Sequence, residues 1–104
     1  MLEVLMAILV TMLVGPVDWE KFKAADEWSK GFPAAERSYS HVYRAESDPS
    51  QVLVVEEWAS HDAMHRYQDQ LGDEFNRRAG TEGLDWQTNI WELPTLCRRF
   101  SVTA

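Results

Sequence analysis

The chain has 104 residues, enough for one domain with a single hydrophobic core and too few for a second domain. Apolar residues make up 45% and aromatic residues 12% of the chain, which excludes a disordered protein. The net charge of −7 disfavours nucleic-acid and membrane-surface binding, since the basic pairs Arg77-Arg78 and Arg98-Arg99 are too short to form a patch. Cys97 is the only cysteine, so no internal disulfide forms, and we expect a cytoplasmic protein.

The first stretch, residues 1–14, has Glu3 and Thr11 as its only polar side chains. It is shorter than the roughly 20 apolar residues of a membrane span. It also lacks the leading basic residues and the cleavage site of a signal peptide. Rich in Val, Leu, Ile and Met and ended by Gly15-Pro16, it predicts a β-strand.

The next segment, residues 18–30, predicts a helix that Asp18 caps and that Gly31 follows. Its apolar residues recur at three-residue spacing: Trp19, Phe22, Ala25 and Trp28.

Two strands follow the first helix. Residues 37–45 alternate in strand periodicity, the polar stretch 46–50 turns the chain, and residues 52–58 resume as a strand, which together predict an antiparallel hairpin.

The remaining chain predicts a second helix and a last strand. Ser60 caps the helix and Gly80 ends it, and the strand spans residues 86–93 before Pro94. The tail, residues 95–104, shows no period.

The order of these elements, β-α-β-β-α-β, predicts an α+β ferredoxin-like fold over residues 1–94, with an antiparallel four-stranded sheet. Two helices shield only one face of such a sheet. The first strand, however, is apolar at even positions, such as Ile8, and largely at odd positions, such as Leu9. A second copy of the sheet is the simplest cover for the other face, so we expect a homodimer.

Three stretches of the sequence, DWEKFKAADEW, HVYRAESDPSQVLVVEEWAS and HDAMHRYQDQLGDEFNRRAG, resemble the antibiotic biosynthesis monooxygenase-like family of the dimeric α+β barrel superfamily. The resemblance covers about residues 4–93, and its motifs mark the fold more than a reaction. It implies a dimeric barrel. Among relatives it implies cofactor-independent oxygenation of aromatic polyketides or quinols, haem degradation, isomerisation or decarboxylation.

Two departures from this family limit what the resemblance implies. Oxygenating members often set an Asn and a Trp toward the pocket, whereas Val54 stands four residues before Trp58 here. Haem-degrading members use a first-strand Asn with a Trp and a His on the second helix. The first strand here has no Asn, and those helix positions fall on Tyr67 and Arg77, which argues against haem degradation.

The strongest candidate for chemistry is the row Tyr39, His41 and Tyr43 on one side of the second strand. If that side lines a cavity, the row would bind a planar phenolic ligand and His41 would act as a base. The ordinary alternative is that these aromatic rings belong to a dimer core or cover strand edges.

Four further positions are candidates for ligand binding: Trp58, Trp91, His65 and Tyr67. Period two places Trp86 and Trp91 on opposite faces of the sheet, so one of them should face the helices. The adjacent Glu56 and Glu57 must likewise point to opposite faces, and the inward carboxylate should pair with Arg37 or Arg44 across the hairpin.

The sequence favours neither a metal nor a cofactor. His61 and His65 lie one helical turn apart, but a third ligand with clear spacing is missing. No glycine-rich phosphate loop follows a strand, and Cys97 has no obvious activating partner.

Three hypotheses follow. The protein is a cofactor-independent oxygenase acting on an aromatic or quinoid molecule, or a non-catalytic small-molecule-binding dimer, or a scaffold for other chemistry such as isomerisation or for structural assembly.

Overall fold

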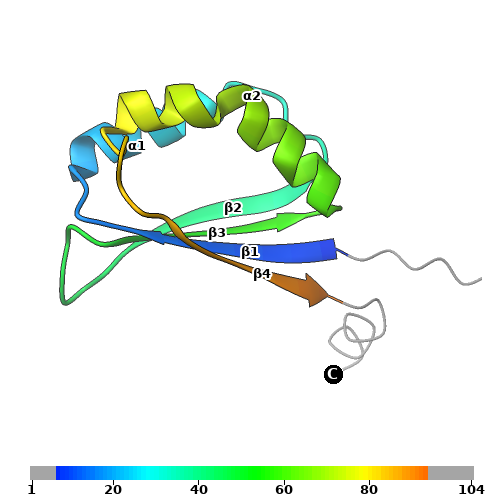
Figure 1. The fold of residues 1–104 in the computed structure, drawn as a ribbon, viewed down its shortest axis with the longest axis horizontal. Helices are drawn as coiled ribbons and strands as arrows, with labels where there is room; N and C mark the ends of the chain where they lie inside the picture. The colour runs from blue at the N-terminus through cyan, green and yellow to red at the C-terminus, as the bar shows by residue number, and fades with distance from the viewer. Residues whose placement is uncertain (1–6, 94–104) are drawn as a thin grey trace, which may run out of the picture.

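The computed structural model describes residues 7–93, which form a four-stranded antiparallel sheet with two helices on one face (Figure 1). The strand order is β2-β3-β1-β4, so the first and third strands lie in the middle of the sheet. The elements are β1 (Ala7–Val14), α1 (Trp19–Ser29), β2 (Arg37–Arg44), β3 (Val52–Trp58), α2 (His61–Ala79) and β4 (Gln87–Leu93). The predicted ferredoxin-like order and the antiparallel β2-β3 hairpin are confirmed.

The helices begin at the caps that the sequence indicates. The side chain of Asp18 accepts a hydrogen bond from the backbone N–H of Lys21 at 3.2 Å, and Ser60 Oγ accepts one from Ala63 at 3.1 Å. Gly80 ends α2 with a φ of 72°, a left-handed conformation that glycine adopts without strain. The observed bounds of the two helices differ little from the predicted ones. Residues 1–6 of the predicted first strand and the tail from residue 94, which includes Cys97, lie outside the described residues.

The core lies between the helices and the sheet. Residues at even positions of β1 and β3 face the helices, and Val10, Val14, Val52 and Trp58 are all 2% exposed or less. Phe22 of α1 is fully buried against the β1 and β3 side chains. Alternation along β1 and β3 therefore places a largely apolar layer under the helices, which Glu56 interrupts.

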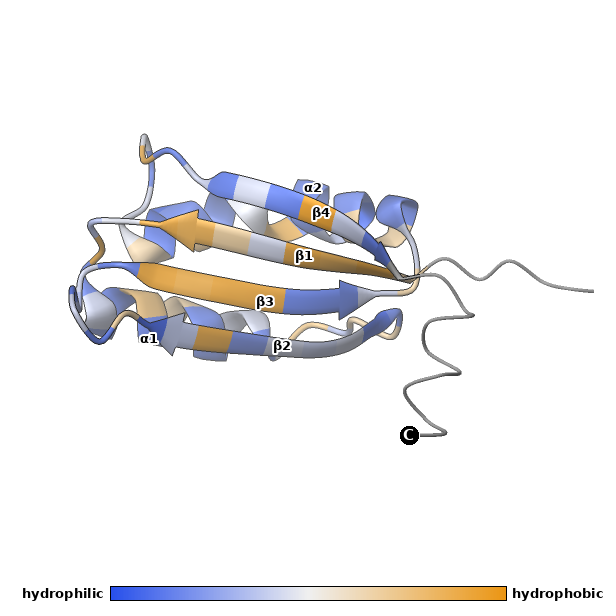
Figure 2. Ribbon diagram, turned by 90° about the horizontal axis from the view of Figure 1, so that it is seen from below, coloured by the Kyte–Doolittle hydropathy of each residue, from blue (hydrophilic) through white to orange (hydrophobic). Residues whose placement is uncertain are grey.

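No helix among the described residues covers the opposite face of the sheet, and Figure 2 shows from this side the largely apolar strand β1 beside β3, which is apolar in its first part and hydrophilic toward its end. Large apolar or aromatic side chains on this open face are substantially exposed: Leu13 by 37%, Tyr39 by 37%, Tyr43 by 53% and Trp91 by 56%. Within residues 7–93, no helix is long and apolar enough to cross a membrane.

We expect Phe22→Ala to lower the free energy of unfolding by about 3–5 kcal/mol, because it removes a fully buried ring from the helix–sheet core. Urea denaturation followed by circular dichroism measures this loss. Phe32→Ala is the matched control, since Phe32 is 36% exposed and should cost under about 1 kcal/mol. Equal losses for both variants would contradict the assignment of the core.

Candidate functional site

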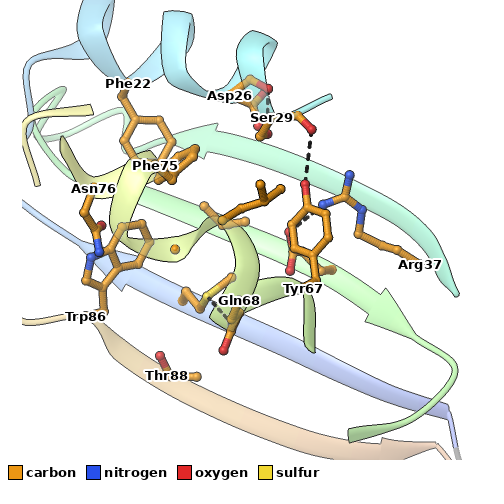
Figure 3. A pocket seen from close by; sticks show the side chains of 15 residues that line it. Phe22, Asp26, Ser29, Arg37, Tyr67, Gln68, Phe75, Asn76, Trp86 and Thr88 are labelled. Atoms are coloured by element: carbon orange, nitrogen blue, oxygen red, sulfur yellow. Dashed lines mark hydrogen bonds and ion pairs between the residues drawn. The ribbon is translucent and has the colours of Figure 1, made fainter. Parts of the chain in front are cut away.

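A cavity of about 290 Å³ lies between the helices and the covered face of the sheet (Figure 3). Both helices and all four strands, or the residues next to them, contribute to it. Its lining consists of Met12, Phe22, Asp26, Ser29, Arg37, Val54, Glu56, Tyr67, Gln68, Leu71, Gly72, Phe75, Asn76, Trp86 and Thr88.

One end of the cavity has aromatic walls, as Figure 3 shows. The rings of Phe22 and Phe75 meet edge to face with centroids 5.4 Å apart, and Trp86 lies 6.1 Å from Phe22 and 6.4 Å from Phe75. Such arrangements are favourable for aromatic pairs. The Nε1 of Trp86 is buried and has no hydrogen-bond partner among the described residues.

The other end of the cavity is polar and charged. Arg37 Nη1 lies 3.3 Å from Glu56 Oε2, and the two side chains are only 12% and 10% exposed. Ser40 Oγ also donates to Oε2 at 3.2 Å, while Trp58 Nε1 donates to Oε1 at 3.0 Å. The buried carboxylate is therefore held by three donors, which is the condition for burying a charge without a large penalty.

The guanidinium of Arg37 also contacts two aromatic rings. It lies 5.0 Å from the ring centroid of Tyr67 and 5.6 Å from that of Trp58, within the range of cation–π attraction. The hydroxyl of Tyr67 donates to the carbonyl of Ser29 at 3.2 Å and so ties α2 to the end of α1. Among the described residues, only Glu56 accepts a hydrogen bond from this guanidinium, which leaves further N–H donors for a ligand.

The structure brings one predicted ligand-binding residue, Tyr67, to the cavity wall. Trp58 is 2% exposed and packs against Tyr67 with centroids 5.2 Å apart, next to the cavity but outside its lining. His65 is exposed on α2, with its ring 4.4 Å from that of His61. Arg77, where the resemblance places a helix site, is exposed and pairs with Glu74.

The row of Tyr39, His41 and Tyr43 lies on the open face of the sheet, opposite the cavity. Its ring centroids are 5.0 Å and 6.2 Å apart along the strand, and all three residues are exposed. Trp91 is on this face too, with Nε1 3.5 Å from Thr11 Oγ1. The binding and catalytic roles predicted for this row depend on a chamber on the open face and stay predictions.

Two pairing predictions are resolved by the structure. Glu56 is the inward carboxylate and its partner is Arg37, whereas Arg44, the other predicted partner, lies over the ring of Trp19 at 5.0 Å. Trp86 packs against the core, while Trp91 is exposed on the open face, as period two predicts.

Sequence reasoning did not assign Phe22, Gln68, Gly72 and Phe75 to a site, although all four line the cavity. On α2 the lining residues form two rows at four-residue spacing, Tyr67, Leu71 and Phe75 in one and Gln68, Gly72 and Asn76 in the other. In the sequence, the first row has the spacing of the apolar stripe of a core helix. The second row, which interrupts this helix face with two amides and a glycine, was the signal that could have indicated a cavity.

No group of three or more His, Cys, Asp or Glu side chains among residues 7–93 is placed to hold a metal ion. On the solvent side of α2, hydrogen bonds from Arg77 and then Arg78 hold the pKa of the Glu74 carboxyl below its ordinary value. The carboxylate therefore favours the folded state above its unfolded pKa, and this contribution is lost as the pH falls through the lowered value. Glu74 does not line the cavity.

Several solved structures share this architecture, and each is similar to this chain over most of its length. A conserved protein from Methanosarcina mazei is 18% identical with a TM-score of 0.67, and the match covers 84% of this chain and 92% of that one. A candidate antibiotic biosynthesis monooxygenase from Bordetella bronchiseptica is 17% identical with a TM-score of 0.63, covering 86% and 96%. SnoaB, a cofactor-independent oxygenase from Streptomyces nogalater, is 17% identical with a TM-score of 0.61, covering 83% and 90%.

The chain has the fold of antibiotic biosynthesis monooxygenase-like proteins. The resemblance in the sequence is thus confirmed at the level of the fold. No protein-family model matches the sequence, and no curated protein matches it significantly. Fold similarity at this identity carries no substrate or catalytic residue to this chain, so the function has to be argued from the cavity.

We expect Arg37→Met to lower the free energy of unfolding by about 3 kcal/mol, because the Glu56 carboxylate stays buried without its countercharge. Urea titration measures this loss. The double variant Arg37→Met with Glu56→Gln should recover most of it, since the amide keeps an oxygen for Ser40 or Trp58 and carries no charge. A double variant as unstable as the single one would show that the ion pair is not the cause.

Proposed function

We propose that the protein binds a planar aromatic or quinoid molecule in the cavity between α2 and the sheet and oxygenates it without a cofactor. The observation that carries the proposal is one cavity with aromatic walls at one end and the buried Arg37–Glu56 pair at the other. Ligand sites are typically mostly apolar pockets with few, well-placed polar groups. The fold shared with SnoaB, a cofactor-independent oxygenase, supports this class of reaction.

The proposed reaction needs an electron-rich anion of the substrate. A ring CH₂ next to a carbonyl, as in an anthrone, loses a proton to water, and the resulting anion transfers an electron to O₂. The substrate radical and the superoxide combine into a peroxide on that carbon. This peroxide takes back a proton, loses the second hydrogen of the carbon as its O–O bond breaks, and so expels water and leaves a carbonyl. One oxygen atom enters the substrate and the other leaves as water. The guanidinium of Arg37 would favour the anion, while Phe22, Phe75 and Trp86 would hold the ring away from water.

The His41 row is the second candidate site for the same reaction. It requires a chamber between two sheets, and Tyr39 and Tyr43 would then orient the ring with His41 as the base. The described lining of the helix-side cavity contains no histidine, which is the observation that favours keeping this candidate. The absence of a histidine from the described lining equally favours a protein that binds an aromatic molecule without transforming it.

We also propose that the protein is a homodimer formed through the open face of the sheet. The half-buried or exposed side chains Leu9, Leu13, Leu53 and Val55 lie there on the two middle strands, with Trp91 beside them. Monomeric soluble proteins rarely expose apolar patches beyond about 300–600 Å², and a two-fold axis places one patch against its copy.

Oxygen uptake with a panel of hydroquinones and anthrones tests the reaction and its site. We expect the double variant Arg37→Met with Glu56→Gln to reduce the rate about 100-fold, because it removes the charge that stabilises the anion. His41→Ala should stay within about twofold of the wild type. The opposite pattern would move the site to the open face. No uptake by the wild type, with an aromatic molecule retained in native mass spectrometry, would identify a non-catalytic binding protein.

Light scattering tests the assembly. We expect a particle of twice 12.0 kDa at micromolar concentration. Val55→Lys should raise the dimer dissociation constant at least about 100-fold, because the two-fold axis buries an unpaired ammonium on each copy. Phe32→Lys is the control, since Phe32 follows α1, away from the open face. A monomeric wild type would contradict the proposed dimer.

A further inference from the structure

A glycine, Gly72, stands in the interior of α2, where the usual reasons for glycine are missing. Positive φ angles occur at Gly80 and Gly83 but not at Gly72. A Cβ built on Gly72 would meet no atom within 4 Å, so no neighbouring backbone or side chain excludes a larger residue. A helix with glycine in its interior is less stable than the same helix with alanine at that position. The stability of the fold alone would therefore favour alanine at position 72.

The empty space beside Gly72 belongs to the cavity. Gly72 lines it, and its neighbours one turn away on either side, Gln68 and Asn76, line it as well. The missing side chain leaves a notch in α2 between two amides. Thr88 of β4 lines the same cavity, and Figure 3 shows it together with the amides of Gln68 and Asn76. The notch thus gives a ligand access to the helix backbone between two polar side chains.

Gln68 in this notch has a weak partner that a ligand can replace. Its Nε2 lies 3.9 Å from the thioether sulfur of Met12, and no other hydrogen-bond partner for this amide occurs among the described residues. Thioether sulfur is a weak acceptor, so an oxygen atom would bind the amide better. Asn76 is more firmly held, because its Oδ1 accepts a hydrogen bond from Thr81 Oγ1 at 2.7 Å.

We infer that Gly72 determines ligand specificity: its notch receives an oxygen-bearing edge of the ring, and Gln68 hydrogen-bonds that oxygen. This inference rests on the proposed binding of an aromatic molecule in the cavity. The ligand class it selects is a ring with a hydroxyl or carbonyl group on the edge that faces α2, in preference to the bare hydrocarbon. The role is one of positioning and selection, and no proton or electron passes through Gly72.

The test compares Gly72→Ala and Gly72→Leu with the wild type, using 1-naphthol and naphthalene as probes in calorimetric titrations. Gly72→Ala should raise the melting temperature by about 3–8 °C, because alanine is the better helix former, and yet weaken 1-naphthol binding about tenfold. Gly72→Leu should abolish binding. Asp73→Ala, on the exposed side of the same turn, is the control that improves the helix and should leave binding unchanged.

A second variant tests the oxygen contact. Gln68→Leu should bring the affinity for 1-naphthol down to that for naphthalene, while naphthalene binding changes less than twofold. If Gly72→Ala binds 1-naphthol as the wild type does, the role of Gly72 is wrong while the cavity proposal stands. If the wild type binds neither probe nor any larger hydroquinone or anthrone, the proposed function fails, and this inference fails with it.

Discussion

Two helices cover one face of a sheet whose strand β1 is largely apolar on both faces, and this constraint divides the molecule into a covered side and an open side. On the covered face, Val10, Val52 and Phe22 close a dry core. On the other face, Leu13 and Trp91 are 37% and 56% exposed among the described residues. The hydrophobic effect is proportional to the apolar area removed from water, which is the physical reason for the proposal that a second surface of similar character covers this face.

The cavity arises where the helix layer and the sheet do not close completely. Aromatic rings pack against one another at one end, while the cation–π contact of Arg37 with Tyr67 and the hydrogen bond from Tyr67 to Ser29 link the elements at the other end. The space between these two ends is widened by Gly72, which contributes no side chain. A cavity of this kind costs stability, because its lining atoms lose contacts that a packed interior would supply.

Like the cavity, the buried Arg37–Glu56 pair offers no clear gain in stability over a packed apolar interior. Buried ion pairs are often no more stabilising than well-packed apolar residues of the same volume. An ion pair that lines a cavity therefore supports a binding role more than an ion pair in a closed core would. Here Arg37, Ser40 and Trp58 all donate to the carboxylate, while the guanidinium, which lines the cavity, has donors without a partner among the described residues. A guanidinium with donors left over, at the opposite end of the cavity from the aromatic walls, suits a ring that carries an electron-rich or anionic group.

Sequence pattern alone determined the element order, the caps Asp18 and Ser60, the αL glycine Gly80 and the pairing partner of the inward glutamate to within two arginines, because these depend on local chain geometry and on period two. It also singled out Tyr39, His41 and Tyr43 as neighbours, which they are. Only the tertiary structure decided which face of the sheet carries the cavity, because both faces of β1 are largely apolar in the sequence and the fold alone shows which face the helices cover. It also decided that Gly72 faces open space and that Arg37, not Arg44, holds Glu56, because such contacts join residues far apart in the chain, whose spacing a linear pattern does not encode.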